Sequence, residues 1–407
     1  MKRFISIFLA VLFVCAMFTS CAKDEANNGG TDEPKTTPAG EDVKVDNIVT
    51  GPINPLTGEA LDSYDTTLRP YCVMINNVPA ARYAKNLSEA SIIYEVSVEG
   101  ATRLMAIYDD ISGLDIGYVR SARTYFASLC KSYDAIYVHW GRSEDTRENT
   151  VAYTRENNIP DMDALDGDYT GHRSQERINA GKNIEHTAYL EGSNVVSNAE
   201  RLGYTKHASG YDTTYGLIFS PEAASQCTTP AANFTVKYGT GAFASNFKYD
   251  STTKLYALSM NESGNTQHPY VDENGTALTF TNVIVLNVPL SQTGDYKGHV
   301  AMEFVGSGTG YFCCGGNYVP IKWTRSSLDD SFHYTLEDGS KLALGIGKTF
   351  VCVSDLDGIG GVNWNAQFDL SKILRNDCCG GFFAQKIGHP KTDARYRYYS
   401  SQLCQTF

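Results

Sequence analysis

Arginine, glutamate and histidine side chains between residues 95 and 139 are the part of the sequence best suited to chemistry. Arg120 and Arg123 are three residues apart, and Arg103 precedes them. If a helix begins near Arg120, both guanidinium groups lie on one of its faces, beside the free N–H groups and partial positive charge of the helix N-terminus. The spacing therefore predicts a site that binds a phosphate or a carboxylate.

Two carboxylates and a histidine extend the chemistry that this group could perform. Glu95 and Glu99 lie on an expected strand and the turn after it. His139 lies near the C-terminal end of another expected strand, where open α/β sheets place their ligands. A carboxylate, a histidine and an arginine form a workable set for acid–base catalysis and for stabilising an anion.

The same residues also suit a structural role. Interfacial pairs of arginine and carboxylate are common in partly buried sheets and need no ligand. Three alternatives therefore stay open for the group: an ion-pair network, an anion-binding site and a catalytic site. The candidate residues are Arg103, Arg120, Arg123, His139, Glu95 and Glu99. A histidine such as His139, taken alone, is more typical of a core or an edge than of a catalyst.

Strands and one helix must position these side chains. Two runs of β-branched and aromatic residues, Ser91–Val98 and Ala101–Asp109, flank Glu99-Gly100 and predict a hairpin. The other expected elements are a strand over 69–76, a helix from Ser121, as its N-cap, to about Ser132, and a strand over 134–140. The order strand, helix, strand predicts an α/β unit with a mixed sheet.

The texture changes from about residue 230. Short alternating segments follow one another, separated by Gly, Asn and Asp, and Asp338-Gly339 is a strong hairpin signal. The expected fold class is therefore α+β or α/β, with a mixed-sheet α/β first domain, 54–205, and a β-rich second domain, 230–364. The pattern assigns no fold to the cysteine-containing tail, 365–407.

Glycine and cysteine motifs give no cofactor or metal site. Gly345–Thr349 ends like a phosphate loop, but Leu342 stands where the first glycine is required. Gly306–Gly310 lacks the dinucleotide-binding spacing and is expected to form a turn. The adjacent pairs Cys313-Cys314 and Cys378-Cys379 converge poorly on a zinc ion, so we expect small buried thiols.

The N-terminus has the pattern of a processing signal. Basic residues precede the apolar stretch Phe4–Phe18, which is too short to span a bilayer, and Thr19-Ser20 leads into Cys21. This arrangement resembles a bacterial lipobox, in which the cysteine receives a diacylglycerol after cleavage. The expected segments are a signal peptide, 1–20, and a lipidated Cys21 that begins a disordered polar tether, 21–53.

Charge and hydropathy exclude two classes of protein. The chain has 407 residues with 46 acidic against 34 basic side chains, a formal charge of −12. An acidic surface argues against nucleic-acid binding, which depends on neutralising phosphates. The chain contains no apolar run of 18 residues or more, which excludes a polytopic membrane protein.

Several segments together resemble the YerB-like lipoproteins, which are two-domain extracytoplasmic proteins of Gram-positive bacteria without a defined biochemical function. The segments are NPLTG (54–58), RPYCVMINN (69–77), LSEASIIYEVSVEGATRLMAIY (87–108), GYVRSARTYF (117–126) and YDAIYVHWG (133–141). The resemblance continues at NVIVLNV (282–288), GNYVPIKW (316–323) and DGSKLALGIGKTFVCV (338–353). It implies a lipid-anchored protein on the extracytoplasmic face of the cell membrane and supplies no reaction.

These observations predict a membrane-anchored protein that binds an envelope component, such as a cell-wall polymer, or an envelope protein. The alternative is a cell-envelope hydrolase or transferase acting on a phosphate- or glycan-containing substrate, with Arg120, Arg123, His139 and Glu95 as its site. Convergence of the candidate residues on one open pocket would favour a site. Ion pairs closed under the sheet would favour a structural role.

Overall fold

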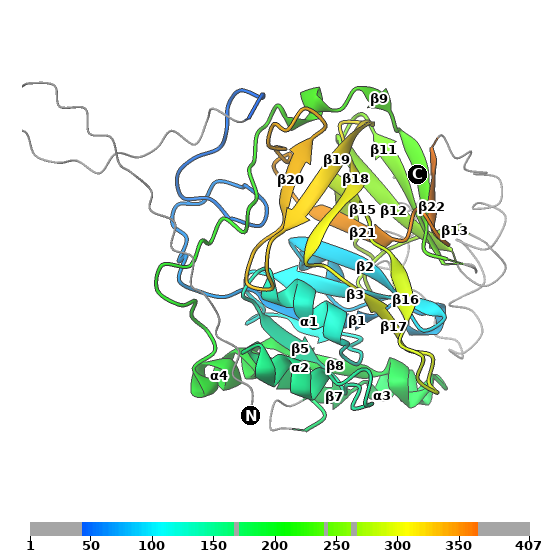
Figure 1. Cartoon of the computed structure of the whole chain (residues 1–407). Coiled ribbons are helices and arrows are strands. Elements are labelled where there is room, and N and C mark those ends of the chain that lie inside the picture. Colours follow the sequence, from blue (N-terminus) through cyan, green and yellow to red (C-terminus); the bar gives the residue numbers. More distant parts are fainter. Residues whose placement is uncertain (1–42, 167–170, 240–242, 262–266, 365–407) are drawn as a thin grey trace, which may run out of the picture. The chain divides into compact units, whose positions relative to one another are not determined.

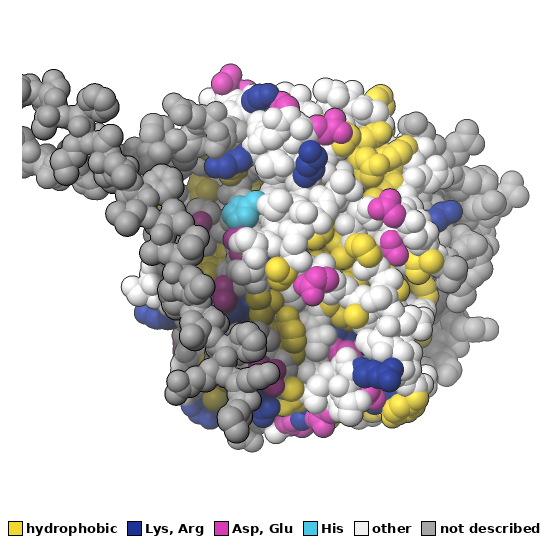
Figure 2. Space-filling model, viewed as in Figure 1, with side chains coloured by type: hydrophobic (Ala, Val, Ile, Leu, Met, Phe, Trp, Pro, Cys, Tyr) yellow, Lys and Arg dark blue, Asp and Glu magenta, His cyan; other side chains and the backbone are white. Residues whose placement is uncertain are grey.

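The computed structural model describes residues 43–166, 171–239, 243–261 and 267–364 (Figure 1). The predicted signal peptide, Cys21 and the tail from residue 365 lie outside these ranges. Within them, no helix combines the length and the apolar character needed to cross a membrane. Figure 2 shows basic and acidic side chains interspersed, without an extended basic area on the face that it presents.

An eleven-stranded mixed sheet runs through both predicted domains. The first contributes β1 (Tyr71–Asn76), β2 (Ile92–Val98), β3 (Ala101–Tyr108), β5 (Ile136–His139) and β6 (Asp161–Asp163). The second contributes β9 (Thr229–Pro230), β15 (Asn282–Asn287), β18 (Gly306–Cys314), β19 (Asn317–Arg325), β20 (His333–Leu336) and β21 (Thr349–Ser354). The strand order is β20-β19-β18-β15-β21-β2-β3-β1-β5-β6, and β9 pairs with β19.

The two regions join where β2 pairs with β21. These strands are parallel, with Ile92 opposite Thr349 and Val96 opposite Val353, while β2 pairs antiparallel with β3 on its other side. All seven residues of β2 are buried because both faces of this central strand are covered. The expected fold class, a mixed-sheet α/β region followed by a β-rich region, is confirmed.

A six-stranded sheet covers one face of the large sheet. It consists of β10 (Asn233–Lys237), β11 (Ala244–Asp250), β12 (Leu255–Asn261), β13 (Gln267–Pro269), β14 (Thr279–Phe280) and β22 (Gly361–Trp364). Its Phe247 meets Phe350 of β21 with ring centroids 5.4 Å apart. The opposite face packs against helix α1 (Thr124–Lys131), whose Phe126 shares a buried cluster with Val96. Each face of the large sheet therefore has its own core.

The remaining elements are small. A three-stranded sheet contains β4 (Asp115–Gly117), β7 (Gly171–Arg173) and β8 (Ala188–Glu191). A hairpin consists of β16 (Leu290–Gln292) and β17 (Val300–Met302). The helices are α2 (Thr150–Glu156), α3 (Gln175–Asn179) and α4 (Gly192–Leu202), with 3₁₀ turns at Pro79–Ala81, Leu87–Glu89, Ile184–His186 and Ala223–Gln226.

The glycines between 306 and 310 belong to a strand, so the expected turn there is wrong. They begin β18, which pairs with β15 and β19. A Cβ on Gly308 would lie 2.5 Å from the indole Nε1 of Trp323, and one on Gly310 would lie 2.3 Å from the carbonyl oxygen of Val285. The glycines here serve close packing between strands.

The described part of the predicted tether, residues 43–53, lies against the folded region. The N–H of Val49 donates to the carbonyl of Phe219 at 2.8 Å. Lys44 forms an ion pair with Asp338, and Val45 is buried. This end of the segment therefore belongs to the folded protein.

Six cysteines in the described ranges are buried free thiols: Cys72, Cys130, Cys227, Cys313, Cys314 and Cys352. Cys313 and Cys314 are consecutive on β18, so their side chains point to opposite faces of the sheet and enter different cores. Adjacent thiols on a strand therefore cannot bind one ion together. The described residues contain no group of three or more potential metal ligands.

Candidate functional site

The register of the β2–β3 hairpin decides which candidate residues can meet. Residues directly opposite one another in an antiparallel pair point to the same face. Val96 is opposite Arg103, and Glu95 is opposite Leu104. Arg103 therefore lies on the face that carries α1, whereas Glu95 lies on the face that carries the six-stranded sheet. These two predicted partners are separated by the sheet itself.

Glu95 is the centre of a closed network of hydrogen bonds between the two sheets. It is 1% exposed, and each of its oxygens accepts from two side chains. The donors are Asn77 (3.0 Å) and Thr102 (2.7 Å) to Oε1, and Tyr238 (2.8 Å) and Ser245 to Oε2. Burial raises the pKa of Glu95, although these hydrogen bonds and the charge of Arg82 oppose the shift. No described Lys or Arg pairs with it within 4.0 Å.

His139 is likewise closed. The side chain is fully buried, with Nδ1 3.0 Å from the carbonyl oxygen of Gly141 and Nε2 2.6 Å from a carboxylate oxygen of Asp161. The other oxygen of Asp161 accepts from Thr154 at 2.9 Å. Both ring nitrogens of His139 therefore contact protein oxygens, and neither nitrogen contacts an arginine of the candidate group.

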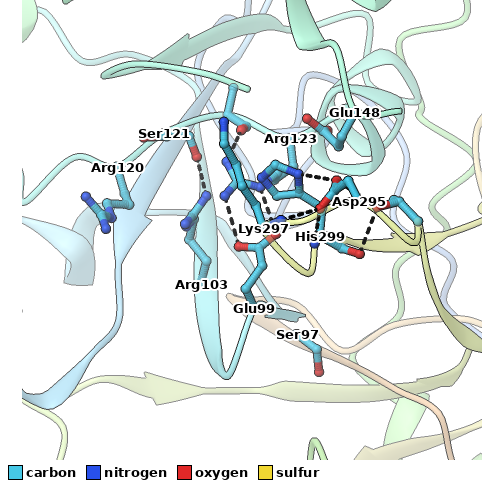
Figure 3. Close-up of polar contacts among 12 residues, drawn as sticks. Ser97, Glu99, Arg103, Arg120, Ser121, Arg123, Glu148, Asp295, Lys297 and His299 are labelled. Carbon is cyan, nitrogen blue, oxygen red and sulfur yellow. Dashed lines mark hydrogen bonds and ion pairs between the residues drawn. The ribbon is translucent and has the colours of Figure 1, made fainter. Parts of the chain in front are cut away.

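Arg123 and Glu99 form a two-pronged ion pair on the α1 side of the hairpin (Figure 3). Nε and Nη2 of Arg123 donate to the two oxygens of Glu99 at 3.0 and 2.9 Å. Burial raises the pKa of Glu99, but the hydrogen bonds and charge of Arg123 outweigh it and hold that pKa below its usual value. Burial also lowers the pKa of Arg123, and Glu99 more than reverses this effect.

Arg120 has a separate and more exposed partner. Its Nη2 lies 2.8 Å from Oε2 of Glu185, and about a third of the Arg120 side chain is accessible, at 32%. Surface pairs of this kind contribute little to stability because water and salt screen them.

Among the three candidate arginines, Arg103 is the one without a carboxylate partner in the described part of the chain. Nη1 donates to the carbonyl oxygen of Ser121, and the residue is only 6% exposed. No ion pair within 4.0 Å involves it in the described part of the chain. Burial, followed by the charge of Arg123, lowers the pKa of Arg103 to about 10, so the guanidinium stays charged at neutral pH. The three candidate arginines thus have two carboxylate partners between them, Glu99 and Glu185.

The prediction that Arg120 and Arg123 share a helix face is wrong. Helix α1 begins at Thr124, and Arg123 is its N-cap in an extended conformation, so Ser121 is not the cap. The segment before it stays extended because Arg120 N–H bonds to the carbonyl of Met74 and Ala122 N–H bonds to that of Gly141, both at 2.9 Å.

A carboxylate already occupies the start of α1. The N–H of Thr124 donates to Oε1 of Glu148 at 2.6 Å, and Glu148 is 2% exposed. The helix N-terminus therefore does not offer the free anion-binding groups expected from the sequence. Glu148 was not predicted as a site residue, because it lies in a charged stretch of sequence that resembles an exposed helix.

The hairpin β16–β17 brings the second region to the edge of this cluster. Nη1 of Arg147 donates to the carbonyls of Thr293, at 3.2 Å, and Gly294. Inside the loop, Asp295 accepts from four groups: the Thr293 hydroxyl (2.8 Å), Lys297 N–H (2.9 Å), His299 N–H (3.1 Å) and His299 Nδ1 (2.6 Å). These bonds fix the conformation of the loop that Figure 3 shows beside Arg123.

Two cavities adjoin these regions. One, of about 270 Å³, lies at the turn of the β2–β3 hairpin. Its lining residues are Ser97, Val98, Gly100, Ala101, Tyr238, Gly239, Phe243, Leu290, Gln292, Val300 and Ile359. The other, of about 340 Å³, is lined by segments around Ser88, Thr279 and Lys348. None of the predicted site residues is among the described residues that line either cavity.

Comparison with known proteins gives the family. Residues 56–205 match the model described as "Protein of unknown function (DUF3048) N-terminal domain", and residues 234–351 match the corresponding C-terminal domain. The chain belongs to the DUF3048 family. The resemblance to YerB-like proteins inferred from the sequence is confirmed.

A relative and a solved structure of this family agree. The chain is 28% identical over 308 residues to the Bacillus subtilis protein named "Putative lipoprotein YerB", covering 74% of this chain and 86% of the relative. The crystal structure of B. subtilis YerB matches with a TM-score of 0.63 and 26% identity, over 77% of this chain and all of that one.

A DUF3048 protein brings no assigned reaction, so the chemistry must be inferred from the geometry. The structure brings Arg103, Arg120, Arg123 and Glu99 together. It holds Glu95 on the opposite face of the sheet and encloses His139 between Gly141 and Asp161. The arginine cluster, defined here as Arg103, Arg120 and Arg123, has one guanidinium whose charge no carboxylate balances.

Proposed function

We propose that this chain is a lipid-anchored extracytoplasmic protein that binds an anionic component of the cell envelope at the arginine cluster. Support for the anchor comes from the N-terminal pattern that ends at Cys21 and from the name of the B. subtilis relative. Cys21 itself lies outside the described residues.

The unpaired guanidinium of Arg103 is the observation that carries the binding proposal. Removing a charge from water costs several kcal/mol unless an opposite charge compensates it. Arg123 and Arg120 each have a carboxylate, whereas Arg103 has a single backbone acceptor. An oxyanion that reaches Arg103 would replace the missing counter-ion, and a guanidinium fork matches phosphate and carboxylate geometry.

Binding is favoured over catalysis because the acid–base groups of the enzymatic alternative are engaged elsewhere. Both oxygens of Glu95 accept hydrogen bonds within the protein, and both nitrogens of His139 contact protein oxygens. A general acid or base must reach the substrate proton. Neither Glu95 nor His139 lies beside the arginines in a position to transfer a proton to a bound substrate.

The binding proposal is tested by Arg103→Met, with inorganic phosphate as the probe in isothermal titration calorimetry. We expect about a tenfold or larger loss of phosphate affinity, as for the loss of a charge-assisted hydrogen bond. The melting temperature should stay the same or rise, because the variant removes a buried unpaired charge.

Arg155→Met is the matched control, since Arg155 is an exposed arginine on α2 that lies outside the cluster. It should bind phosphate like the wild type. Unchanged affinity in Arg103→Met, or a large drop in its melting temperature, would show that Arg103 is structural.

The anchor is tested by Cys21→Ser, which removes the sulfur that would carry the lipid. We expect the variant to appear in the soluble fraction or the medium. Cys15→Ser changes a cysteine inside the apolar stretch and should leave the protein attached to the membrane. Retention of Cys21→Ser on membranes would refute the anchor.

A further inference from the structure

We infer that the anion bound at the arginine cluster carries a short alkyl chain, which enters the cavity at the turn of the β2–β3 hairpin. This inference rests on the proposed function and names the class of ligand: an amphiphile with an oxyanion head. Its basis is the position, the lining and the size of the cavity of about 270 Å³.

The described residues that line the cavity are mostly apolar, and none of them carries a charged side chain. Val98 and Ala101 come from the first region, and Leu290, Val300 and Ile359 come from the second. Ser97 contributes a hydroxyl that already donates to the carbonyl oxygen of Tyr238 at 3.0 Å. Such a surface suits a hydrocarbon and offers nothing to replace the hydration of a charge.

The cavity is adjacent to the arginine cluster through the hairpin itself. Ala101 and Arg103 are alternate residues of β3, so their side chains lie on the same face about 7 Å apart. Val98 and Gly100, which line the cavity, flank Glu99, the partner of Arg123. Gly100 has a φ of +67° and no atom within 4 Å of its Cβ position, which leaves the turn open. Figure 3 shows the Glu99 and Arg103 side chains near each other at this hairpin.

The size of the cavity limits the alkyl chain of the ligand to a short one. If each group occupies about 30 Å³, as a water molecule does in the liquid, the cavity holds roughly nine such groups. A linear chain of up to about eight carbons fits this space. Burial of each methylene should raise the affinity about fourfold.

The experiment compares inorganic phosphate, butyl phosphate and octyl phosphate, below their micelle-forming concentrations, on the full mature chain by calorimetry. We expect affinity to rise in that order. Octanoate forms a second arm: tighter binding of octyl phosphate assigns a phosphate head, and tighter binding of octanoate assigns a carboxylate. Binding of octanol as tight as either would overturn the inference, because the head would then contribute nothing.

Two variants test whether the alkyl chain of the ligand binds in the cavity. Val300→Trp fills the cavity and should remove the dependence on chain length while keeping the affinity for inorganic phosphate. Ile359→Ser changes a rim residue that is 49% exposed, so the fold tolerates it, and should weaken octyl phosphate alone. Leu165→Trp, at a residue 59% exposed and outside the cavity, is the matched control.

The outcomes separate the two proposals. If the wild type binds no inorganic phosphate and no alkyl phosphate, the proposed function fails. If it binds phosphate but the chain length has no effect, only the amphiphile fails. A chain-length effect that persists unchanged in Val300→Trp and in Ile359→Ser would also overturn the assignment of the cavity.

Discussion

Glu95 and Glu99 lie four residues apart on one hairpin and have opposite surroundings. Glu95 is enclosed between two sheets and accepts from an amide and three hydroxyl groups. Glu99 lies in the hairpin turn, on the side that faces α1, and its two oxygens accept from the guanidinium of Arg123. Burial raises the pKa of the first, while Arg123 lowers that of the second against the effect of burial.

The difference shows how one hairpin can supply a structural carboxylate and a site carboxylate. Neutral donors satisfy the lone pairs of Glu95 without balancing its charge. Such a carboxylate is suited to linking the two packed sheets by hydrogen bonds. The Arg123–Glu99 pair lies next to Arg103 and orders the cluster around it. Removal of each carboxylate should therefore give different effects on stability and on binding.

The largest expected effect is that of Glu95→Ala. The substitution leaves Asn77 and Tyr238 without an acceptor inside the core, and we expect a loss of about 3 kcal/mol in the free energy of unfolding. Denaturant unfolding measures it. Phosphate affinity of the folded variant should not change.

Glu59→Ala, at an exposed carboxylate, is the control for Glu95→Ala. A loss below about 0.5 kcal/mol at position 95, the range usual for surface changes, would contradict the closed network.

The next effect is the coupling between Arg123 and Glu99. A double-mutant cycle of Arg123→Met and Glu99→Gln should give a coupling energy of about 1–2 kcal/mol, because the pair is two-pronged and mostly buried. Each single variant should also weaken phosphate binding, since the cluster around Arg103 loses its order. If the two substitutions had additive effects on the free energy of unfolding, Arg123 and Glu99 would not be energetically coupled, which would contradict the ion pair.

The pH dependence should have opposite signs for the two carboxylates. The folded-state pKa of Glu95 is raised, so its contribution is present below the unfolded pKa and is lost as pH rises. The folded-state pKa of Glu99 is lowered, so its contribution is present above the unfolded pKa and is lost as pH falls.

Unfolding at about pH 7 and about pH 3, on either side of the usual pKa range of glutamate, measures this contrast. On acidification, the stability advantage of the wild type over Glu99→Gln should shrink. Its advantage over Glu95→Gln should grow. Changes of the same sign in both comparisons would contradict the assignment.

The smallest effect belongs to Arg120→Met. Its pair with Glu185 is exposed, so the loss of stability should stay within about 0.5 kcal/mol. The affinity for phosphate should fall less than in Arg103→Met and should become less sensitive to salt. An effect on binding larger than that of Arg103→Met would move the centre of the site to Arg120.

The β2–β3 hairpin was predictable from the sequence, but the predicted grouping of Glu95 with the arginines was wrong. The turn at Glu99-Gly100 was predicted, and a two-residue turn already places Arg103 opposite Val96 and on the other face from Glu95. The partners of Glu95 were not predictable, because Tyr238 and Ser245 are 143 and 150 residues away along the chain.

Local patterns were also misleading where tertiary contacts decide the structure. Ser121 has the residue type of an N-cap, yet hydrogen bonds from Arg120 to Met74 and from Ala122 to Gly141 keep that segment extended. The glycines at 308 and 310 have the composition of a turn, and their role follows from Trp323 and Val285, which lie beside them only in the folded protein.

The parallel pairing of β2 with β21 has a consequence for how the protein is made. Ile92 pairs with Thr349, which lies 257 residues later in the sequence, so the centre of the large sheet cannot be completed before β21 has been synthesised. Contacts between such distant residues tend to slow folding. During synthesis β2 stays an unprotected edge until residue 354 has emerged. A nascent chain that stops after residue 205 should therefore self-associate through this strand rather than rest as an independent domain.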